Sequence, residues 1–148
     1  MNRKQNICFI INPISGIGRQ KTVERLIADF LDTTAFRHTI AYTQAPKHAT
    51  ELAKHAASKG FDIVVAVGGD GSVNEVARGL IGSNTAMAIL PAGSGNGLAR
   101  HLNIPVTLKK ALLLLQKGTK KKIDTIQFND EQFVNVAGVG FDAHIGWE

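Results

Sequence analysis

The sequence predicts an α/β fold in which helices cover both faces of an open, mainly parallel sheet. Apolar runs typical of strands alternate along the chain with segments of helical periodicity, the order that a parallel sheet requires. The best strand candidate, 62–67, is nearly all apolar and β-branched, as in a strand buried on both faces. With 148 residues, 44% of them hydrophobic, the chain is close to one ordinary domain and can bury a sizeable core.

The first part of the chain predicts two strand–helix units. The apolar run 7–11 predicts a buried strand, and 36–42 predicts a second one. Between them lies a helix whose apolar face is made of Val23, Leu26, Ile27, Phe30 and Leu31. A helix over 47–59 follows the second strand, and Gly60 is its expected C-terminal stop.

Two more units follow the strand at 62–67. A helix is predicted from Ser72 to about residue 81, and the next strand over 86–90. The range 107–116 predicts another helix, which ends near Gly118.

The last thirty residues have a different pattern. The ranges 123–128 and 132–137 flank Asn129-Asp130-Glu131, which is typical of a hairpin rather than of another strand–helix unit. An apolar strand-like run over 139–145 then continues to the end of the chain. This pattern predicts a fragment whose partner domain is absent.

Composition excludes several classes of protein. A single cysteine, Cys8, cannot form an internal disulfide and cannot hold a structural zinc ion alone, which fits a reducing cytoplasm. No apolar run is long enough for a signal-peptide core or a membrane-spanning helix. The net charge of +5 favours an anionic partner, but aromatic residues are only 6% and no nucleic-acid-binding motif occurs. A nucleic-acid partner is therefore not expected.

Glycines and small polar residues follow the predicted strands. They occur in the segments 12–18, 68–72 and 91–97, and Thr43 follows the second strand. In a parallel sheet these loops share the carboxyl edge, where glycine lets backbone N–H groups approach phosphate oxygens. Any one of the loops could be only a tight turn, but three on one edge favour a phosphorylated ligand.

Common phosphate motifs do not explain these loops. No Gly-Lys-Ser/Thr occurs, and neither Gly16-Ile-Gly18 nor Gly93-Ser-Gly95 continues into the dinucleotide fingerprint. Asp70 stands among the glycines, where a carboxylate facing phosphates makes sense if it accepts a proton or holds magnesium. A turn-forming aspartate is the alternative. Ser72 and Glu75 also fit a helix capping box.

Three ordered blocks resemble the signature blocks of the diacylglycerol kinase catalytic domain family, which includes bacterial lipid kinases and sphingosine and ceramide kinases. They are Asn12-Pro13-x-Ser15-Gly16, the run from Gly68 to Val76, and Pro91-Ala92-Gly93-Ser94-Gly95-Asn96. The resemblance implies a Rossmann-like sheet of the NAD kinase and diacylglycerol kinase type. It also implies an ATP- and Mg²⁺-dependent lipid kinase that transfers the γ-phosphate to a lipid hydroxyl, such as that of diacylglycerol or a sphingoid base.

The resemblance assigns roles to individual positions. It makes Asp70 the general base or a metal-linked carboxylate, and it places Asp124 and Asp142 near the acceptor or metal. His48, in a Thr-x4-His-Ala pattern, would lie on the nucleotide side or be only a surface residue at a helix start. The residues expected at the nucleotide are Asn12, Ser15, Gly16, Thr43, Gly68, Gly69, Gly71, Glu75, Gly93, Ser94 and Asn96.

The resemblance also predicts a domain organisation. Residues 1–122 would form the nucleotide-binding domain, and 123–148 would lead into a β-rich lipid-binding domain that this chain lacks. We therefore expect the isolated chain to be nearly inactive and its uncovered docking face to favour self-association. The expected partners are a nucleotide and a lipid at a membrane surface, which fits a cytoplasmic protein peripheral to the inner face.

Two other functions remain open from the sequence. An NAD kinase-like soluble kinase shares the Gly-Gly-Asp-Gly loop, although the other two blocks argue against it. A non-catalytic nucleotide-binding or membrane-recruitment module would also fit. The densest charge cluster, Lys117 with Lys120, Lys121 and Lys122, is either a solvated loop or a contact for an anionic membrane.

Overall fold

The structure, a computed structural model, describes residues 3–14, 19–128 and 130–134. Its elements, in chain order, are β1 (Gln5–Ile11), α1 (Arg19–Phe30), β2 (Phe36–Tyr42), α2 (His48–Ser58), β3 (Ile63–Gly68), α3 (Asp70–Leu80), β4 (Ala86–Pro91), α4 (Gly97–His101), α5 (Leu108–Lys117), β5 (Ile126–Phe128) and β6 (Glu131–Phe133). The first four strands form one sheet in the order β2-β1-β3-β4, and every pair is parallel. The predicted fold class is therefore confirmed.

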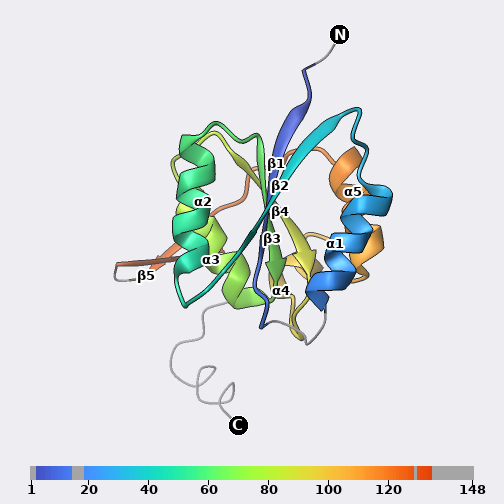
Figure 1. The fold of residues 1–148 in the computed structure, drawn as a ribbon. Helices are drawn as coiled ribbons and strands as arrows, with labels where there is room; N and C mark the ends of the chain where they lie inside the picture. The colour runs from blue at the N-terminus through green and yellow to red at the C-terminus, as the bar shows by residue number, and fades with distance from the viewer. Residues whose placement is uncertain (1–2, 15–18, 129, 135–148) are drawn as a thin grey trace.

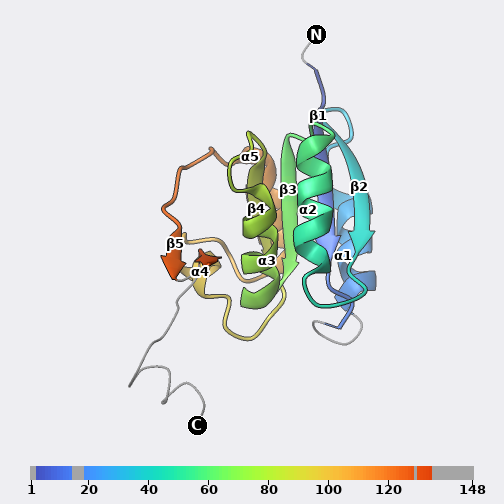
Figure 2. The same cartoon turned by 90° about the vertical axis from the view of Figure 1, so that its left-hand side faces the viewer.

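Helices cover both faces of this sheet, as Figures 1 and 2 show: α2 and α3 lie on one side, and α1 and α5 on the other. Successive residues of β1 alternate between the two cores because side chains of a strand point to opposite faces. Ile7, Phe9 and Ile11 pack with α1 and α5, whereas Cys8 and Ile10 pack with α2 and α3. Burial raises the pKa of the Cys8 thiol, so this cysteine belongs to the core and is not a reactive thiolate.

Two helices differ from the prediction. Helix α3 begins at Asp70 rather than at Ser72, and its N-cap is Gly69 without a side-chain hydrogen bond, so the predicted capping box is wrong. The box fails because Ser72 is the third residue of α3 and therefore cannot be its N-cap. Helix α4 was not predicted, since five residues are too few to show an apolar periodicity. Gly60, by contrast, has the left-handed φ of 79° that a helix stop requires.

A short antiparallel hairpin, β5–β6, lies where the sequence predicts one. It attaches to α3 by two hydrogen bonds. The Nε of Arg78 donates to the Gln132 carbonyl at 3.1 Å, and the Val134 N–H donates to Asn74 Oδ1 at 3.0 Å. The predicted strand at 139–145 lies outside the described residues. The division of the chain at residue 122 stays a prediction.

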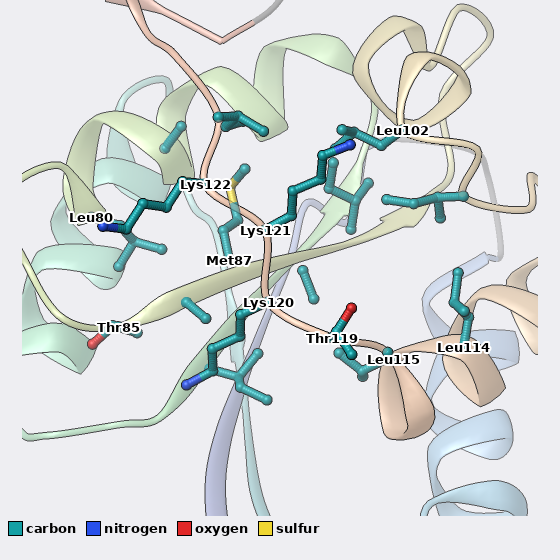
Figure 3. A pocket seen from close by; sticks show the side chains of 18 of the residues that line it. Leu80, Thr85, Met87, Leu102, Leu114, Leu115, Thr119, Lys120, Lys121 and Lys122 are labelled. Atoms are coloured by element: carbon teal, nitrogen blue, oxygen red, sulfur yellow. The ribbon is translucent and has the colours of Figure 1, made fainter.

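The outer edge of β4 borders a groove of about 790 Å³. Leu80 from α3 and Leu114 and Leu115 from α5 contribute its walls, and the segment 119–122 crosses it (Figure 3). Within the described residues, no helix has the length and apolar character needed to cross a membrane.

Helices α2 and α3 pack closely at Gly79. A Cβ atom built on Gly79 would lie 2.5 Å from the Thr50 carbonyl oxygen and 2.7 Å from the Ala53 Cβ. A backbone carbonyl cannot swing away as a flexible side chain can. The two helices can therefore approach this closely only because residue 79 has no side chain.

We expect Gly79→Ala to lower the free energy of unfolding by about 1–3 kcal/mol, the usual cost of forcing an extra methyl group into a packed interface. Urea unfolding followed by circular dichroism measures this. Gly71→Ala is the matched control in the same helix, because nothing lies within 4 Å of a Cβ there. It should leave stability unchanged or raise it by about 0.5–1 kcal/mol. Equal stability of Gly79→Ala and the parent would contradict the packing argument.

A charged contact ties the start of β1 to the start of β3. Arg3 donates from both terminal nitrogens to the Asp62 carboxylate at 3.1 and 2.7 Å, and the Asn6 N–H donates to it at 2.7 Å. These contacts hold the pKa of Asp62 below its usual value, with the Arg3 hydrogen bond as the largest cause. A carboxyl with a lowered folded-state pKa stabilises the fold above its unfolded pKa and loses that contribution as the pH falls through its folded pKa.

Asp62→Asn should therefore destabilise the chain at pH 7, and the difference from the parent should vanish as the pH falls below the folded pKa of Asp62. Arg3→Gln should show the same pH dependence with a smaller loss, because the Asn6 N–H bond to Asp62 remains. Urea unfolding at neutral and acidic pH measures both variants. A loss for Asp62→Asn that is the same at every pH would rule out the charged contact as its cause.

Candidate functional site

The four loops that carry the predicted site residues meet at one edge of the sheet. The Asn12 N–H donates to the Val67 carbonyl at 3.4 Å, the Thr43 N–H to the Ile11 carbonyl at 3.0 Å, and the Ala92 N–H to the Gly68 carbonyl at 2.9 Å. Backbone pairing thus continues past the strand ends and holds the loops side by side. Figure 1 shows the strands running toward this edge, which also carries α4.

The order β2-β1-β3-β4 reverses its direction between β1 and β3. The connection from β1 leads outward to β2, and the chain then returns over β1 to start β3. In open α/β sheets the loops diverge at such a point and leave a crevice in which ligands bind. Asn12 follows one of these two strands, and Gly69 and Asp70 follow the other.

Two glycines bring the loop after β3 against the loop after β4. A Cβ built on Gly93 would lie 2.4 Å from the Gly69 Cα, and one built on Gly69 would lie 3.2 Å from the Gly93 Cα. Real Cβ atoms do not approach backbone atoms at the first of these distances. Glycine at positions 69 and 93 is therefore required for the contact between the two loops. This requirement is separate from any role of the two glycines in binding a ligand.

Asn96 holds the second loop in shape. Its Oδ1 accepts from the Gly93 N–H at 3.1 Å, and its Nδ2 donates to the Gly93 carbonyl at 2.8 Å. The residue is buried and adopts a left-handed backbone with φ of 54°, which asparagine tolerates better than most residues. Both ends of this amide are thus engaged within the loop, so Asn96 supports the backbone of the loop after β4.

Asp70 joins the two loops. It is the first residue of α3, it is half-buried, and its Oδ1 accepts from the Gly97 N–H at 2.7 Å. A Cβ on Gly95 would lie 2.6 Å from the other carboxylate oxygen. The carboxylate therefore lies between the start of α3 and the start of α4, directly beside the loop after β4.

Glu75 links α3 to the start of α2. Its Oε1 accepts from the Lys47 N–H at 3.2 Å, and its carbonyl accepts from the Thr50 hydroxyl at 2.8 Å. Lys47 has a left-handed φ of 69°. His48 Nδ1 accepts from the Gln44 N–H at 2.9 Å, just after Thr43. Both predicted residues thus shape the loop after β2.

The remaining predicted residues fall into three groups. Asn12 Oδ1 accepts from the Ile14 N–H at 3.0 Å and forms a turn after β1. Gly71 and Ser94 are exposed at the edge, and Gly68 ends β3. Ser15, Gly16 and Asp142 lie outside the described residues, and Asp124 is exposed in the segment before β5.

Sequence reasoning missed the supporting roles of Gly97 and Arg100. Gly97 supplies the N–H that Asp70 accepts, and the Arg100 Nε donates to the Gly95 carbonyl at 2.9 Å. Gly97 stood within a predicted loop, but nothing in the sequence pairs it with a residue 27 positions earlier. Among the described residues, no three acidic, histidine or cysteine side chains gather as a metal-binding group.

Comparison with known proteins identifies similar chains over most of the length of this one. The chain is 34% identical over 135 residues to the protein named diacylglycerol kinase of Bacillus subtilis strain 168, and this match covers 89% of the chain and 45% of the relative. It is 27% identical over 145 residues to the diacylglycerol kinase of a Staphylococcus saprophyticus strain, covering 95% of the chain and 47% of the relative. The chain thus spans less than half the length of these relatives.

A solved structure agrees with these matches. The crystal structure of a diacylglycerol kinase from Bacillus anthracis strain Sterne superposes with a TM-score of 0.81 at 30% identity, over 91% of this chain and 47% of that one. The family model described as the diacylglycerol kinase catalytic domain matches residues 6–128, from the second residue of β1 to the end of β5. The chain therefore belongs to the diacylglycerol kinase catalytic domain family.

Proposed function

We propose that this chain is the nucleotide-binding part of a lipid kinase that transfers the γ-phosphate of ATP to the hydroxyl of a lipid such as diacylglycerol or a sphingoid base. The observation that carries the proposal is the meeting of two glycine loops and the Asp70 carboxylate at the carboxyl edge of the sheet, next to its switch point. Membership in the family supports the reaction class. The lengths of the relatives support a longer protein as the complete enzyme.

The loops after β3 and β4 have features that favour the binding of a chain of phosphates. The first helical hydrogen bond of α3 runs from the Val73 N–H to the Gly69 carbonyl. The amides of Gly71 and Ser72 precede it and have no partner within the helix, which makes this end of α3 favourable for an anion. The exposed residue Ser94 directly follows Gly93, which contacts Gly69. We propose that phosphates bind at the start of α3, beside the contact between these two loops.

Asp70 is the residue we assign to the chemistry. A carboxylate repels phosphates, so its presence here needs a compensating role. As a general base it would accept the proton of the lipid hydroxyl while the hydroxyl oxygen bonds to the γ-phosphorus. The bond from that phosphorus to its bridging oxygen would break, and ADP would leave with the electron pair.

The site also fits Mg²⁺ in the manner common for this ion, through one or two carboxylates together with substrate phosphates. Asp70 is the residue that would hold it. When bound, the ion would neutralise charge on the phosphates. Asp124 and Asp142 remain candidates for the acceptor side.

The asparagine variant Asp70→Asn tests the base assignment. Asparagine keeps an oxygen that can accept from the Gly97 N–H, so the contact between the loops survives while the proton acceptor is lost. Turnover should fall about 10²–10⁴-fold, the usual contribution of a general base. It should be measured with ATP and dispersed diacylglycerol in the product of the whole open reading frame that contains this chain, with NAD as a competing acceptor. Asp29→Asn, exposed on α1, controls for net charge.

Three outcomes separate the possible roles of Asp70. A loss that added magnesium partly restores would assign it to the ion. A lower melting temperature with normal turnover in the folded fraction would show that Asp70 acts only through its structural contact with Gly97. Turnover within threefold of the parent would rule out the base assignment, and phosphorylation of NAD instead of lipid would rule out the lipid kinase.

Asn96 offers an independent test of the loop. Asn96→Ala removes both hydrogen bonds to Gly93 and places a residue with a Cβ in the left-handed region, whereas Asn96→Gly removes the bonds but keeps the backbone free to adopt it. Leaving the partly buried N–H and carbonyl of Gly93 without these partners should cost about 1 kcal/mol of stability. We expect both variants of this chain to bind ATP more weakly, and Asn96→Ala to be the less stable. Calorimetric titration and thermal melting measure the two effects. Parent-like ATP affinity in both folded variants would show that the loop does not contact the nucleotide.

A further inference from the structure

Asp70, Asn74 and Arg78 form one row along helix α3. They are four residues apart, the spacing that places side chains on the same side of a helix, and all three are half-buried. Each makes a hydrogen bond to the backbone of a segment later in the chain. The first of these contacts, from the Gly97 N–H to Asp70, belongs to the candidate site, whereas the other two hold hairpin β5–β6.

The two contacts with the hairpin satisfy one edge of strand β6 and of the residue after it. Asn74 Oδ1 accepts from the Val134 N–H at 3.0 Å, and Arg78 Nε donates to the Gln132 carbonyl at 3.1 Å. A carbonyl and an N–H group two residues apart point to the same edge of a strand, where a neighbouring strand would normally pair with them. Helix α3 takes the place of that strand with one acceptor and one donor.

Packing supports the same contact. Val134 is half-buried and packs against the core cluster that contains Val76 and Leu80 of α3. The backbone N–H of Val134 can only donate, so it fixes the amide of Asn74 with its oxygen toward the hairpin. The hairpin therefore engages Asn74, although the sequence places this residue within the block from Gly68 to Val76.

The position of the hairpin bears on the reaction that we propose. Asp124, a candidate for the acceptor side, lies two residues before the start of β5. Because so few residues separate them, the attachment of the hairpin to α3 also restrains where Asp124 lies relative to Asp70 at the start of that helix.

We propose that Asn74, together with Arg78, is a positioning residue that holds hairpin β5–β6 against the helix that begins with Asp70. This attachment sets the approach of the acceptor hydroxyl to the transferred phosphate. The inference rests on the proposed function, because it takes Asp70 as the reacting carboxylate, and it assigns to Asn74 no contact with ATP. A misplacement of reacting groups by about 1 Å lowers a rate about 10²-fold, so an attachment remote from the reacting groups affects turnover.

Hydrogen exchange at the Val134 amide tests the attachment in this chain. Asn74→Ala removes the acceptor and should speed exchange of that amide about fivefold, the effect of one hydrogen bond. Asn74→Asp keeps an accepting oxygen and should exchange like the parent. Thr50→Val is the matched control, because it removes a hydrogen bond between α2 and α3, from the Thr50 hydroxyl to the Glu75 carbonyl. It should leave exchange at Val134 unchanged.

Turnover tests the positioning role. It should be measured in the product of the whole open reading frame that contains this chain, with saturating ATP and whichever acceptor the parent phosphorylates, NAD included. We expect Asn74→Ala to lower kcat about 10-fold or more and to leave the Kd for ATP unchanged, and Asn74→Asp to restore kcat.

A second variant removes the other partner of the same hydrogen bond. Val134→Pro lacks the N–H that Asn74 accepts, so it should lower kcat like Asn74→Ala, and the double variant should lose no more than either single one. Because it leaves α3 untouched, Val134→Pro also serves if Asn74→Ala loses structure by circular dichroism.

Four results would overturn the proposal. Parent-like exchange at Val134 in Asn74→Ala would refute the attachment, and parent-like kcat despite faster exchange would refute its role in turnover. Weaker ATP binding in Asn74→Ala but not in Val134→Pro would make Asn74 a nucleotide contact. Losses that add up in the double variant would show that the two groups act separately. Because each variant is compared with the parent on the parent's own acceptor, phosphorylation of NAD instead of lipid would refute the proposed substrate and would still decide this inference.

Discussion

The parallel pairing of β1 with β3 is the constraint on which the rest of the molecule depends. These two strands occupy the centre of the sheet and are buried, with Phe9 facing Val65 across the pair. Their parallel direction forces each connection to cross a face of the sheet as a helix, and it gathers every strand-to-helix loop at one edge. The outward step to β2 and the return to β3 then place the switch point of the sheet between the ends of β1 and β3, which Asn12 and Asp70 follow.

At that edge, the same residues serve the fold and the site. Gly69 and Gly93 let two backbones touch, and Asp70 ties the start of α3 to the start of α4 through the Gly97 N–H. Both the oxygen and the nitrogen of the Asn96 side-chain amide are hydrogen-bonded to Gly93. Since these groups are already hydrogen-bonded before any ligand arrives, the backbone facing the crevice is held in place in advance, which reduces the ordering cost of binding.

The strands, most of the helices and the edge that carries the site followed from the sequence. β2 has the predicted bounds 36–42, Gly93 lies in the predicted loop after β4, and Asp70 begins α3 directly after the turn from β3. These features are local. Burial on one side of a helix leaves a periodic pattern of apolar residues, burial on both sides of a strand leaves a continuous apolar run, and glycine marks where a backbone must turn.

The tertiary structure decided the partners of the polar groups. Glu75 was predicted either to lie at the nucleotide or to cap its own helix, and its carboxylate accepts from Lys47, 28 residues earlier. The Asp70 carboxylate accepts from Gly97. A hydrogen bond between distant residues depends on where packing brings two elements together, and no periodicity along the chain records that position.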